Sequence, residues 1–145
     1  METHPENTRD AAVIVARDAS GLVAVLTARF PQHGGEYLFL PGGRLESGET
    51  PADGARRELR EEAGITASSW QHLGTYAITL NSPARMSLHL AENLTLGRQH
   101  LAEGEEDFKL MWLPMADALD AAAEGRFLLP GGPLALHLAE RRLSA

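Results

Sequence analysis

The sequence predicts an α/β domain in which helices cover a mixed β-sheet. A chain of 145 residues with 43% hydrophobic and 23% charged residues has the size and composition of one soluble globular domain. Short runs rich in β-branched residues alternate with segments of helical apolar spacing, an order that predicts one sheet with helices on its faces. We expect residues 1–10 to be a flexible tail and residues 11–145 to be the single domain.

Two strands are expected at the start of the domain. Residues 11–17 and 22–29 are rich in valine, leucine and isoleucine, and residues 18–21 between them have the composition of a hairpin turn. We therefore predict that these two strands pair with each other. A short strand is expected over residues 37–40, followed by a sharp glycine turn at residues 41–43.

A helix is predicted from Pro51 to Ala63. Thr50 supplies an N-cap hydroxyl, Pro51 suits the first helical position, and Gly64 supplies a C-terminal stop. The remaining segments are assigned by their apolar spacing and turn residues. They comprise strands over 70–80, 86–94 and 109–113, an acidic loop over 97–107, and helices over 115–123 and 133–142.

The charges on the predicted helix are segregated by sign. An apolar stripe, expected to pack on the sheet, comprises Ala52, Ala55, Leu59 and Ala63. Glu58, Glu61 and Glu62 form an arc on one side of it, and Arg56 and Arg60 lie on the other side. Most charged pairs at helical contact spacing are therefore of like sign, and each such pair costs about 0.2–0.5 kcal/mol. The arrangement is unfavourable for a solvated surface helix unless a cation lies against the glutamates.

Clustered carboxylates favour a hard divalent cation, Mg²⁺ or Mn²⁺, because oxygen atoms are the ligands these ions prefer. Mg²⁺ characteristically shares its coordination with water and substrate phosphates, so the cluster indicates phosphate chemistry. Glu58 is also suitably spaced to act as a base toward water bound by the cation.

Composition excludes several other classes. The formal charge of −7 disfavours nucleic-acid and anionic-membrane binding, and the absence of cysteine excludes disulfides and thiol catalysis. A zinc hydrolase is disfavoured because the six histidines lack ligand spacing. Neither a membrane-spanning segment nor a secretory signal is found, so a cytoplasmic location is the expectation.

The residues from Gly43 to Ile65 resemble the Nudix box. Gly43 and Glu49 precede the run Arg57-Glu58-Leu59-Arg60-Glu61-Glu62-Ala63-Gly64-Ile65, and each fixed position matches. The resemblance implies a Nudix-type α/β/α sandwich that cleaves a nucleoside diphosphate linked to another moiety by metal-assisted attack of water on phosphorus. It implies metal ligation by Glu58, Glu61, Glu62 and the carbonyl of Gly42, with Arg57 orienting the glutamates.

The resemblance leaves alternatives open at two of these positions. Glu49 matches an acidic residue of the box, or it serves as a carboxylate at the helix entry. A further glutamate from a later loop completes the metal site or acts as base in many members. Glu106 is the first candidate for this role, with Glu103 and Glu105 as alternatives, and a solvated acidic loop is the other interpretation.

The second half of the chain is similar in layout to ADP-ribose and nucleotide-sugar pyrophosphatases, which carry a proline beyond the box, here Pro83. The alternatives are a nucleoside triphosphate pyrophosphohydrolase of the sanitising type and a non-catalytic nucleotide-binding module. The partner in each case is a small nucleotide, and a homodimer is compatible with the resemblance. The residues proposed to contact substrate are Arg29, Tyr37, Phe39 and Arg85.

Overall fold

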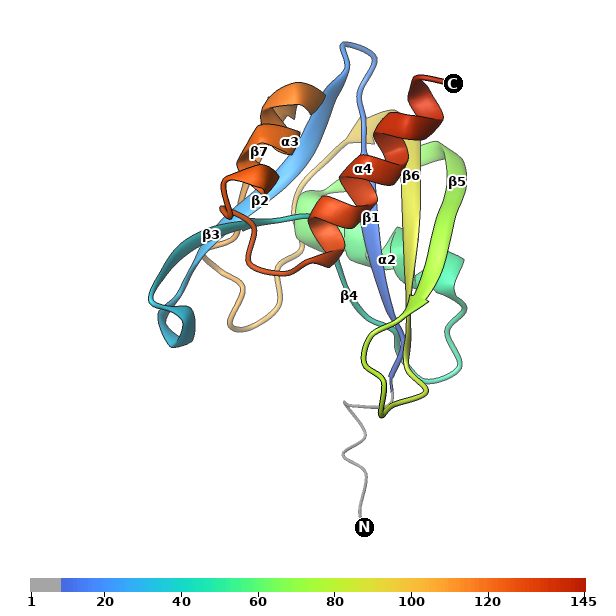
Figure 1. Cartoon of the computed structure of the whole chain (residues 1–145), viewed down its shortest axis with the longest axis vertical. Coiled ribbons are helices and arrows are strands. Elements are labelled where there is room, and N and C mark those ends of the chain that lie inside the picture. The colour runs from blue at the N-terminus through green and yellow to red at the C-terminus, as the bar shows by residue number, and fades with distance from the viewer. Residues whose placement is uncertain (1–8) are drawn as a thin grey trace.

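The computed structural model describes residues 9–145 (Figure 1). The strands are β1 (Ala11–Ala16), β2 (Leu22–Phe30), β3 (Gly35–Phe39), β4 (Gly42–Arg44), β5 (Ile65–Ala77), β6 (Arg85–Leu96) and β7 (Lys109–Pro114). The helices are α2 (Pro51–Ala63), α3 (Met115–Ala123) and α4 (Gly131–Leu143), with a 3₁₀ turn, η1 (Pro31–His33). The predicted tail over residues 1–10 falls largely outside the described residues. Within the described part, no helix is long and apolar enough to cross a membrane.

The strands form two sheets rather than the single sheet that the sequence predicts. The larger sheet has the order β4-β1-β6-β5 and is mixed, because β1 and β6 run parallel whereas the other neighbours are antiparallel. The smaller sheet has the order β3-β2-β7 and is antiparallel throughout. The mixed sheet of the predicted fold class is confirmed, and the prediction of one sheet is wrong.

The predicted pairing of residues 11–17 with 22–29 is also wrong. The turn itself forms, with the Asp18 carboxylate accepting from the backbone of Ser20 and Leu22 at 2.9 Å. Beyond it, only one bridge, Arg17 with Val23, joins the two segments in the described chain. The reason is that β6 and β4 occupy the two edges of β1, so β2 leaves to join the second sheet. A local turn signal does not determine which strands become neighbours.

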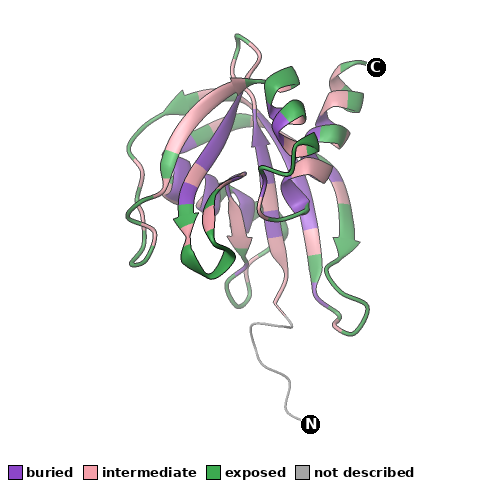
Figure 2. Cartoon of the chain, turned by 60° about the vertical axis from the view of Figure 1, so that its left-hand side comes forward, coloured by how far each residue is buried: buried purple, intermediate pink, exposed green. Residues whose placement is uncertain are grey.

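Helices cover both faces of the mixed sheet. Alternate residues of β1 and β6 pack on opposite sides, because successive side chains of a strand point to opposite faces. Ile14 and Ala91 lie in a buried cluster with Ala55 and Leu59 of α2. Leu88 and Leu90 lie in the other cluster, with residues of α3 and α4. Figure 1 shows strands between α2 and α4, and Figure 2 shows that the central strands are buried. This arrangement confirms the α/β/α sandwich.

Helix α2 begins and ends where its capping residues predict. The Thr50 side chain accepts from the Asp53 backbone at 3.1 Å, and Gly64 adopts a left-handed conformation with φ 69°. One residue of the predicted apolar stripe, Ala52, is exposed in the first turn of α2, whereas Ala55, Leu59 and Ala63 are buried. Gly54 makes the close contact instead: a Cβ there would lie 2.2 Å from the Leu45 side chain.

Further differences from the prediction concern β5 and β4. Strand β5 begins at Ile65, directly after the helix stop, whereas the pattern predicts a start at residue 70. Polar residues before Trp70 obscure the strand pattern, although they pair with the second half of β6. The predicted glycine turn after Leu40 contains the short strand β4, whose glycines pair with Ala12 and Val13. This pairing places the glycines against α2.

Candidate active site

Two glutamates of α2 are buried although they carry ionisable groups. Glu58 and Glu62 are only 9% and 5% exposed, and Glu61 beside them is half-buried. Burial raises the pKa of Glu58 to about 7, and the neighbouring charges of Glu61 and Glu105 add to the rise. Burial likewise raises the pKa of Glu62 to about 9. Carboxylates in such surroundings are stabilised by a positive charge.

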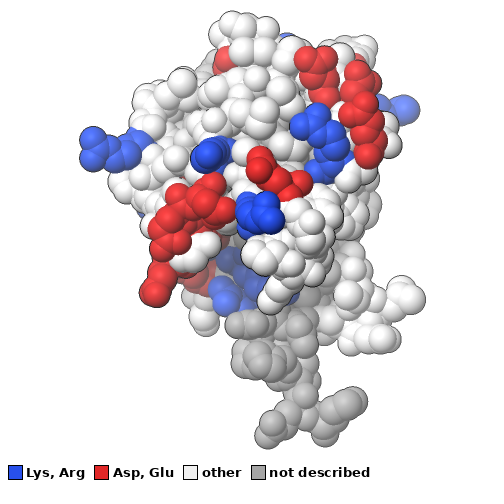
Figure 3. Space-filling view, turned by 90° about the vertical axis from the view of Figure 1, so that its left-hand side faces the viewer, with Lys and Arg blue, Asp and Glu red and all other residues white. Residues whose placement is uncertain are grey.

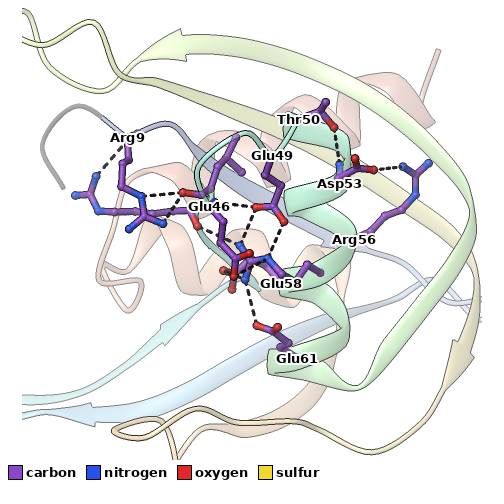
Figure 4. Close-up of polar contacts among 11 residues, drawn as sticks. Arg9, Glu46, Glu49, Thr50, Asp53, Arg56, Glu58 and Glu61 are labelled. Atoms are coloured by element: carbon purple, nitrogen blue, oxygen red, sulfur yellow. Dashed lines mark hydrogen bonds and ion pairs between the residues drawn. The ribbon is translucent and has the colours of Figure 1, made fainter. Parts of the chain in front are cut away.

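Arg57 binds the carboxylates of Glu49, Glu58 and Glu61. These three glutamates are labelled in Figure 4. Its guanidinium donates to both oxygens of Glu49, from Nε at 2.8 Å and from Nη2 at 3.0 Å. Its Nη1 donates to Glu58 at 2.9 Å and to Glu61 at 3.2 Å. The hydrogen bond from Arg57 holds the pKa of Glu49 below its ordinary value. Arg57 therefore links the loop before α2 to two glutamates of the helix.

The glycines of β4 form the wall opposite the glutamates. The Gly42 backbone N–H donates to Glu62 Oε1 at 2.8 Å. A Cβ at Gly43 would lie 3.0 Å from the Glu58 carboxylate, and a Cβ at Gly42 would lie 2.3 Å from the Ala12 carbonyl oxygen. Glycine at position 43 lets the β4 backbone approach Glu58 closely, and glycine at position 42 lets β4 lie close to the β1 backbone.

The acidic loop after β6 is joined to the C-terminal end of α2. The His100 backbone N–H donates to the Glu61 carbonyl, and the Gln99 side chain donates to the Glu62 carbonyl, both at 2.7 Å. Glu105 is among the charges that raise the pKa values of Glu58 and Glu62. The carboxylate of Glu106, which is exposed, accepts from the Gly104 backbone at 3.0 Å.

A family model for the NUDIX domain matches residues 7–129 of this sequence. The chain belongs to the Nudix hydrolase family. The match includes α2, the glycines of β4 and the acidic loop, so all the glutamates described above lie within the Nudix domain.

Three curated relatives are similar over most of this Nudix chain. An ADP-ribose pyrophosphatase of Mycobacterium tuberculosis is 33% identical over 88% of the chain and a CMP-5'-(N-acetyl-N-hydroxy-3-aminopropyl)phosphonate hydrolase of Streptomyces rubellomurinus is 30% identical over 94%. An 8-oxo-(d)GTP phosphatase of Mycolicibacterium smegmatis is 30% identical over 82%. The chain spans 64%, 66% and 38% of the lengths of these three proteins, respectively.

Solved structures share the Nudix fold. An ADP compounds hydrolase superposes with a TM-score of 0.81 at 21% identity, covering 94% of this chain and 73% of that one. A MutT structure, from a study of the Aliivibrio salmonicida and Vibrio cholerae proteins, superposes with a TM-score of 0.69 at 20% identity. It covers 92% of this chain and 98% of the MutT chain. Both similarities concern the fold.

The chemistry of the Nudix glutamates fits a divalent cation, and Nudix hydrolases generally need one. Among residues 9–145, no three side chains of the His, Asp and Glu type converge as a finished ligand cluster. Instead Arg57 occupies oxygens of Glu58 and Glu61, and burial and mutual charge raise the pKa values of Glu58 and Glu62. A hard cation relieves this repulsion and takes oxygen ligands, so the donor set suits Mg²⁺ or Mn²⁺.

The proposed substrate residues lie in different surroundings. Phe39 contacts two rings edge-on, with centroid distances of 5.5 Å to Phe30 and 4.8 Å to Phe108. Arg29 is exposed, and its backbone N–H donates to Asp107 at 3.2 Å, beside the acidic loop. The Tyr37 hydroxyl donates to the His33 carbonyl at 3.0 Å.

Arg85 lies at the start of β6, where its backbone N–H donates to Asp10 at 2.8 Å. Arg85 therefore lies near the beginning of β1. Arg29 and Phe39 lie elsewhere, next to the acidic loop, because Arg29 bonds to Asp107 and Phe39 contacts Phe108.

On the face shown in Figure 3, acidic side chains gather in a patch with basic side chains beside it. Gln99 and Phe108 were not predicted to lie near the site, because neither belongs to a motif and only the folded loop brings them there.

Proposed function

We propose that this Nudix domain is a metal-dependent hydrolase of a nucleoside diphosphate linked to another moiety, with ADP-ribose or a related nucleotide sugar as the favoured substrate. The observation that carries the proposal is the set of Glu58, Glu61 and Glu62 on one side of α2. Arg57 binds Glu58 and Glu61, and the Gly42 N–H binds Glu62. The ADP-ribose pyrophosphatase relative supports the substrate class.

In the proposed reaction, water attacks one phosphorus of the diphosphate and the bridging P–O bond breaks, so two phosphomonoesters form. A divalent cation, when bound by Glu58, Glu61 and Glu62 with the Gly42 carbonyl as a further ligand, supplies charge for the phosphate oxygens and acidifies water. Arg57 orients Glu58 and Glu61 through its hydrogen bonds. Glu58, which is buried in this site and oriented by Arg57, is proposed to accept the proton of the attacking water.

We further propose that Glu105, rather than Glu106, is the loop carboxylate that completes this site. Glu105 is half-buried, and its charge acts on both Glu58 and Glu62. Its Oε1 accepts from the Ala102 backbone at 2.9 Å, which holds the side chain against its own loop. Hydrogen bonds from His100 and Gln99 anchor this loop to α2, so the position of Glu105 relative to the helix is constrained.

The aromatic trio of Phe30, Phe39 and Phe108, with Tyr37 on the same face of the β3-β2-β7 sheet, is proposed to bind the base or sugar of the substrate. Arg29 alternates to the other face of β2 and remains proposed as a substrate contact at the strand end beside Asp107. Aromatic rings stack on nucleobases, and an arginine pairs with phosphate or ribose oxygens. Arg85 remains proposed as a contact for the second, sugar-bearing part of the substrate. Arg85→Ala should then raise KM more than it lowers kcat, because uniform binding is lost.

Hydrolysis of nucleoside triphosphates is the second candidate. The 8-oxo-(d)GTP phosphatase relative and the MutT-like fold favour it. A panel of ADP-ribose, nucleotide sugars, dinucleotides and nucleoside triphosphates, each assayed with Mg²⁺ and with Mn²⁺, separates the two candidates. The first candidate requires the highest kcat/KM on ADP-ribose or a nucleotide sugar. Triphosphates as the best substrates would establish the second, and full turnover in excess chelator would contradict both.

A further inference from the structure

A cavity lies on the other side of α2 from the glutamates, between this helix and β5. Its volume is about 380 Å³, and Asp53, Arg56, Arg57, Arg60, Thr66 and Trp70 line it. None of Glu58, Glu61 and Glu62 contributes to its wall. Figure 4 shows Arg56 extending from α2 away from Glu58 and Glu61. This cavity therefore presents cations on a chain whose formal net charge is −7.

Two of its arginines lack a close acidic partner. Arg60 makes no side-chain hydrogen bond or ion pair with any residue from 9 to 145. Among residues 9–145, Asp53 is the acidic residue that Arg56 approaches, at 3.8 Å, and both side chains are more than half exposed, at 54% and 68%. Because Arg56 and Arg60 are four residues apart, they lie on the same side of the helix and repel each other. An anion between them would remove that repulsion.

Trp70 fixes the direction of one of these arginines. The Arg56 guanidinium lies 5.4 Å from the centroid of the Trp70 ring, within the range of a cation–π contact. The ring is itself held by a hydrogen bond of 3.1 Å from its Nε1 to the Ala67 carbonyl. Arg56 is thereby directed along the cavity wall rather than left to sample many rotamers. Thr66, exposed at the start of β5, adds a hydroxyl to the same wall.

We propose that this cavity, with Arg56 and Arg60 as its cationic groups and Thr66 as a neutral donor, binds a phosphate dianion, either free or as the terminal phosphate of a mononucleotide. Guanidinium groups offer paired N–H donors that match phosphate oxygens. The cavity is large enough for phosphate with part of an attached nucleoside. The proposal is independent of the hydrolytic reaction proposed above.

The test is an NMR titration of the isotopically labelled full chain in the presence of chelator, so that the glutamate site holds no cation and no turnover occurs. Inorganic phosphate, AMP and adenosine are added separately at constant ionic strength. The Trp70 indole N–H and the Nε–H groups of Arg56 and Arg60 are followed. We expect saturable shifts with phosphate and with AMP, with a Kd on the order of 1 mM, and none with adenosine. A tighter Kd for AMP than for phosphate would identify the nucleotide as the preferred source.

Variants locate the binding. Arg60→Gln and Arg56→Gln should each weaken phosphate binding by about ten-fold or more, because each removes a charged donor. Arg60→Lys, which retains the charge, should weaken it less. Arg141→Gln, an exposed arginine on α4, is the matched control and should have no effect. Equal shifts with adenosine or with added chloride, no saturation by about 10 mM phosphate, or equal loss in Arg141→Gln would overturn the proposal.

Discussion

The two sides of α2 carry opposite charges in different surroundings. On one side Glu58 and Glu62 are buried, and on the other Arg56 and Arg60 are exposed. Arg57 belongs to the acidic side through its bonds to Glu49, Glu58 and Glu61, and its side chain is 16% exposed against 54% for Arg56. Adjacent arginines on one helix thus have different partners. Arg57 bonds to Glu49 in the loop before α2, whereas Arg56 contacts Trp70 of β5.

On each side of α2, nearby groups offset the repulsion between like charges. On the acidic side, Arg57 and the Gly42 N–H partly offset the repulsion between glutamates. On the basic side, solvent and Trp70 offset it. Both sides therefore keep uncompensated charge. A cation can bind on the acidic side, and an anion can bind on the basic side.

Removing charge from the acidic side should have the largest effect. Glu61→Gln and Glu62→Gln keep the side-chain shape but remove a carboxylate from the ligand set. Each should lower kcat by roughly 10²–10³-fold while the fold persists, because charge stabilisation at the phosphates is lost. Steady-state kinetics at saturating Mg²⁺ and Mn²⁺, with circular dichroism for the fold, measure this. A variant with near wild-type turnover would lose its assignment as a ligand.

The next prediction compares substitutions of the adjacent arginines Arg57 and Arg56. Arg57→Lys keeps the positive charge but cannot bond Glu49 through two nitrogens and still reach Glu58 and Glu61. We expect kcat to fall by about 10–100-fold with a small change in KM, because the glutamates lose their orientation. Arg56→Lys, one residue away on the other side of α2, is the control and should retain wild-type kinetics. Equal losses in the two variants would show that both sides serve catalysis alike.

The loop carboxylates provide a smaller, matched pair. Glu105→Gln should lower kcat by about ten-fold or more, because Glu105 is proposed to act on the same site as Glu58 and Glu62. Glu106→Gln should change kcat less than about two-fold, since its carboxylate bonds to its own loop and is exposed. Single-turnover rates with pre-bound substrate distinguish an effect on chemistry from one on binding. The reverse order of effects would restore Glu106 as the catalytic candidate.

The buried glutamates of the acidic side should make the stability of the fold depend on pH. Glu58 and Glu62 have folded-state pKa values of about 7 and about 9, above the ordinary value of 4.5. Their contribution to stability is therefore complete below pH 4.5 and is lost as pH rises through 7 and 9. The metal-free protein should lose on the order of 1 kcal/mol between pH 7 and 9, and Mg²⁺ or Mn²⁺ should restore it by binding the native state.

Thermal melting at several pH values, with and without the cation, measures this effect. The control is Glu62→Gln, which cannot titrate and should have a shallower slope between pH 7 and 9. Burial lowers the pKa of His89 to about 4 from its ordinary value of 6.5. His89 therefore makes the fold less stable as pH falls below 6.5, and it does not contribute to the change between pH 7 and 9. An unchanged slope in Glu62→Gln, or melting insensitive to millimolar cation, would contradict the expectation.

Local features of the chain were sufficient to predict α2 and its charges. The side chain of Thr50, the ring of Pro51 and the missing side chain of Gly64 act within one helical turn, so the boundaries of α2 follow from neighbours in sequence. The arc of Glu58, Glu61 and Glu62 likewise follows from helical periodicity. The divalent-cation chemistry and the Nudix resemblance both depend on this short segment.

Contacts between distant segments decided the rest. The Asp18 turn forms locally, yet β1 pairs with β4 and β6 because their backbones occupy both of its edges. Glu105 reaches the electrostatic range of Glu58 because Gln99 and His100 anchor its loop to α2, which no acidic pattern encodes. Trp70 meets Arg56 only because β5 folds back beside the helix. Capping and helical spacing act over a few residues, whereas strand pairing and loop anchoring depend on which surfaces the whole chain buries together.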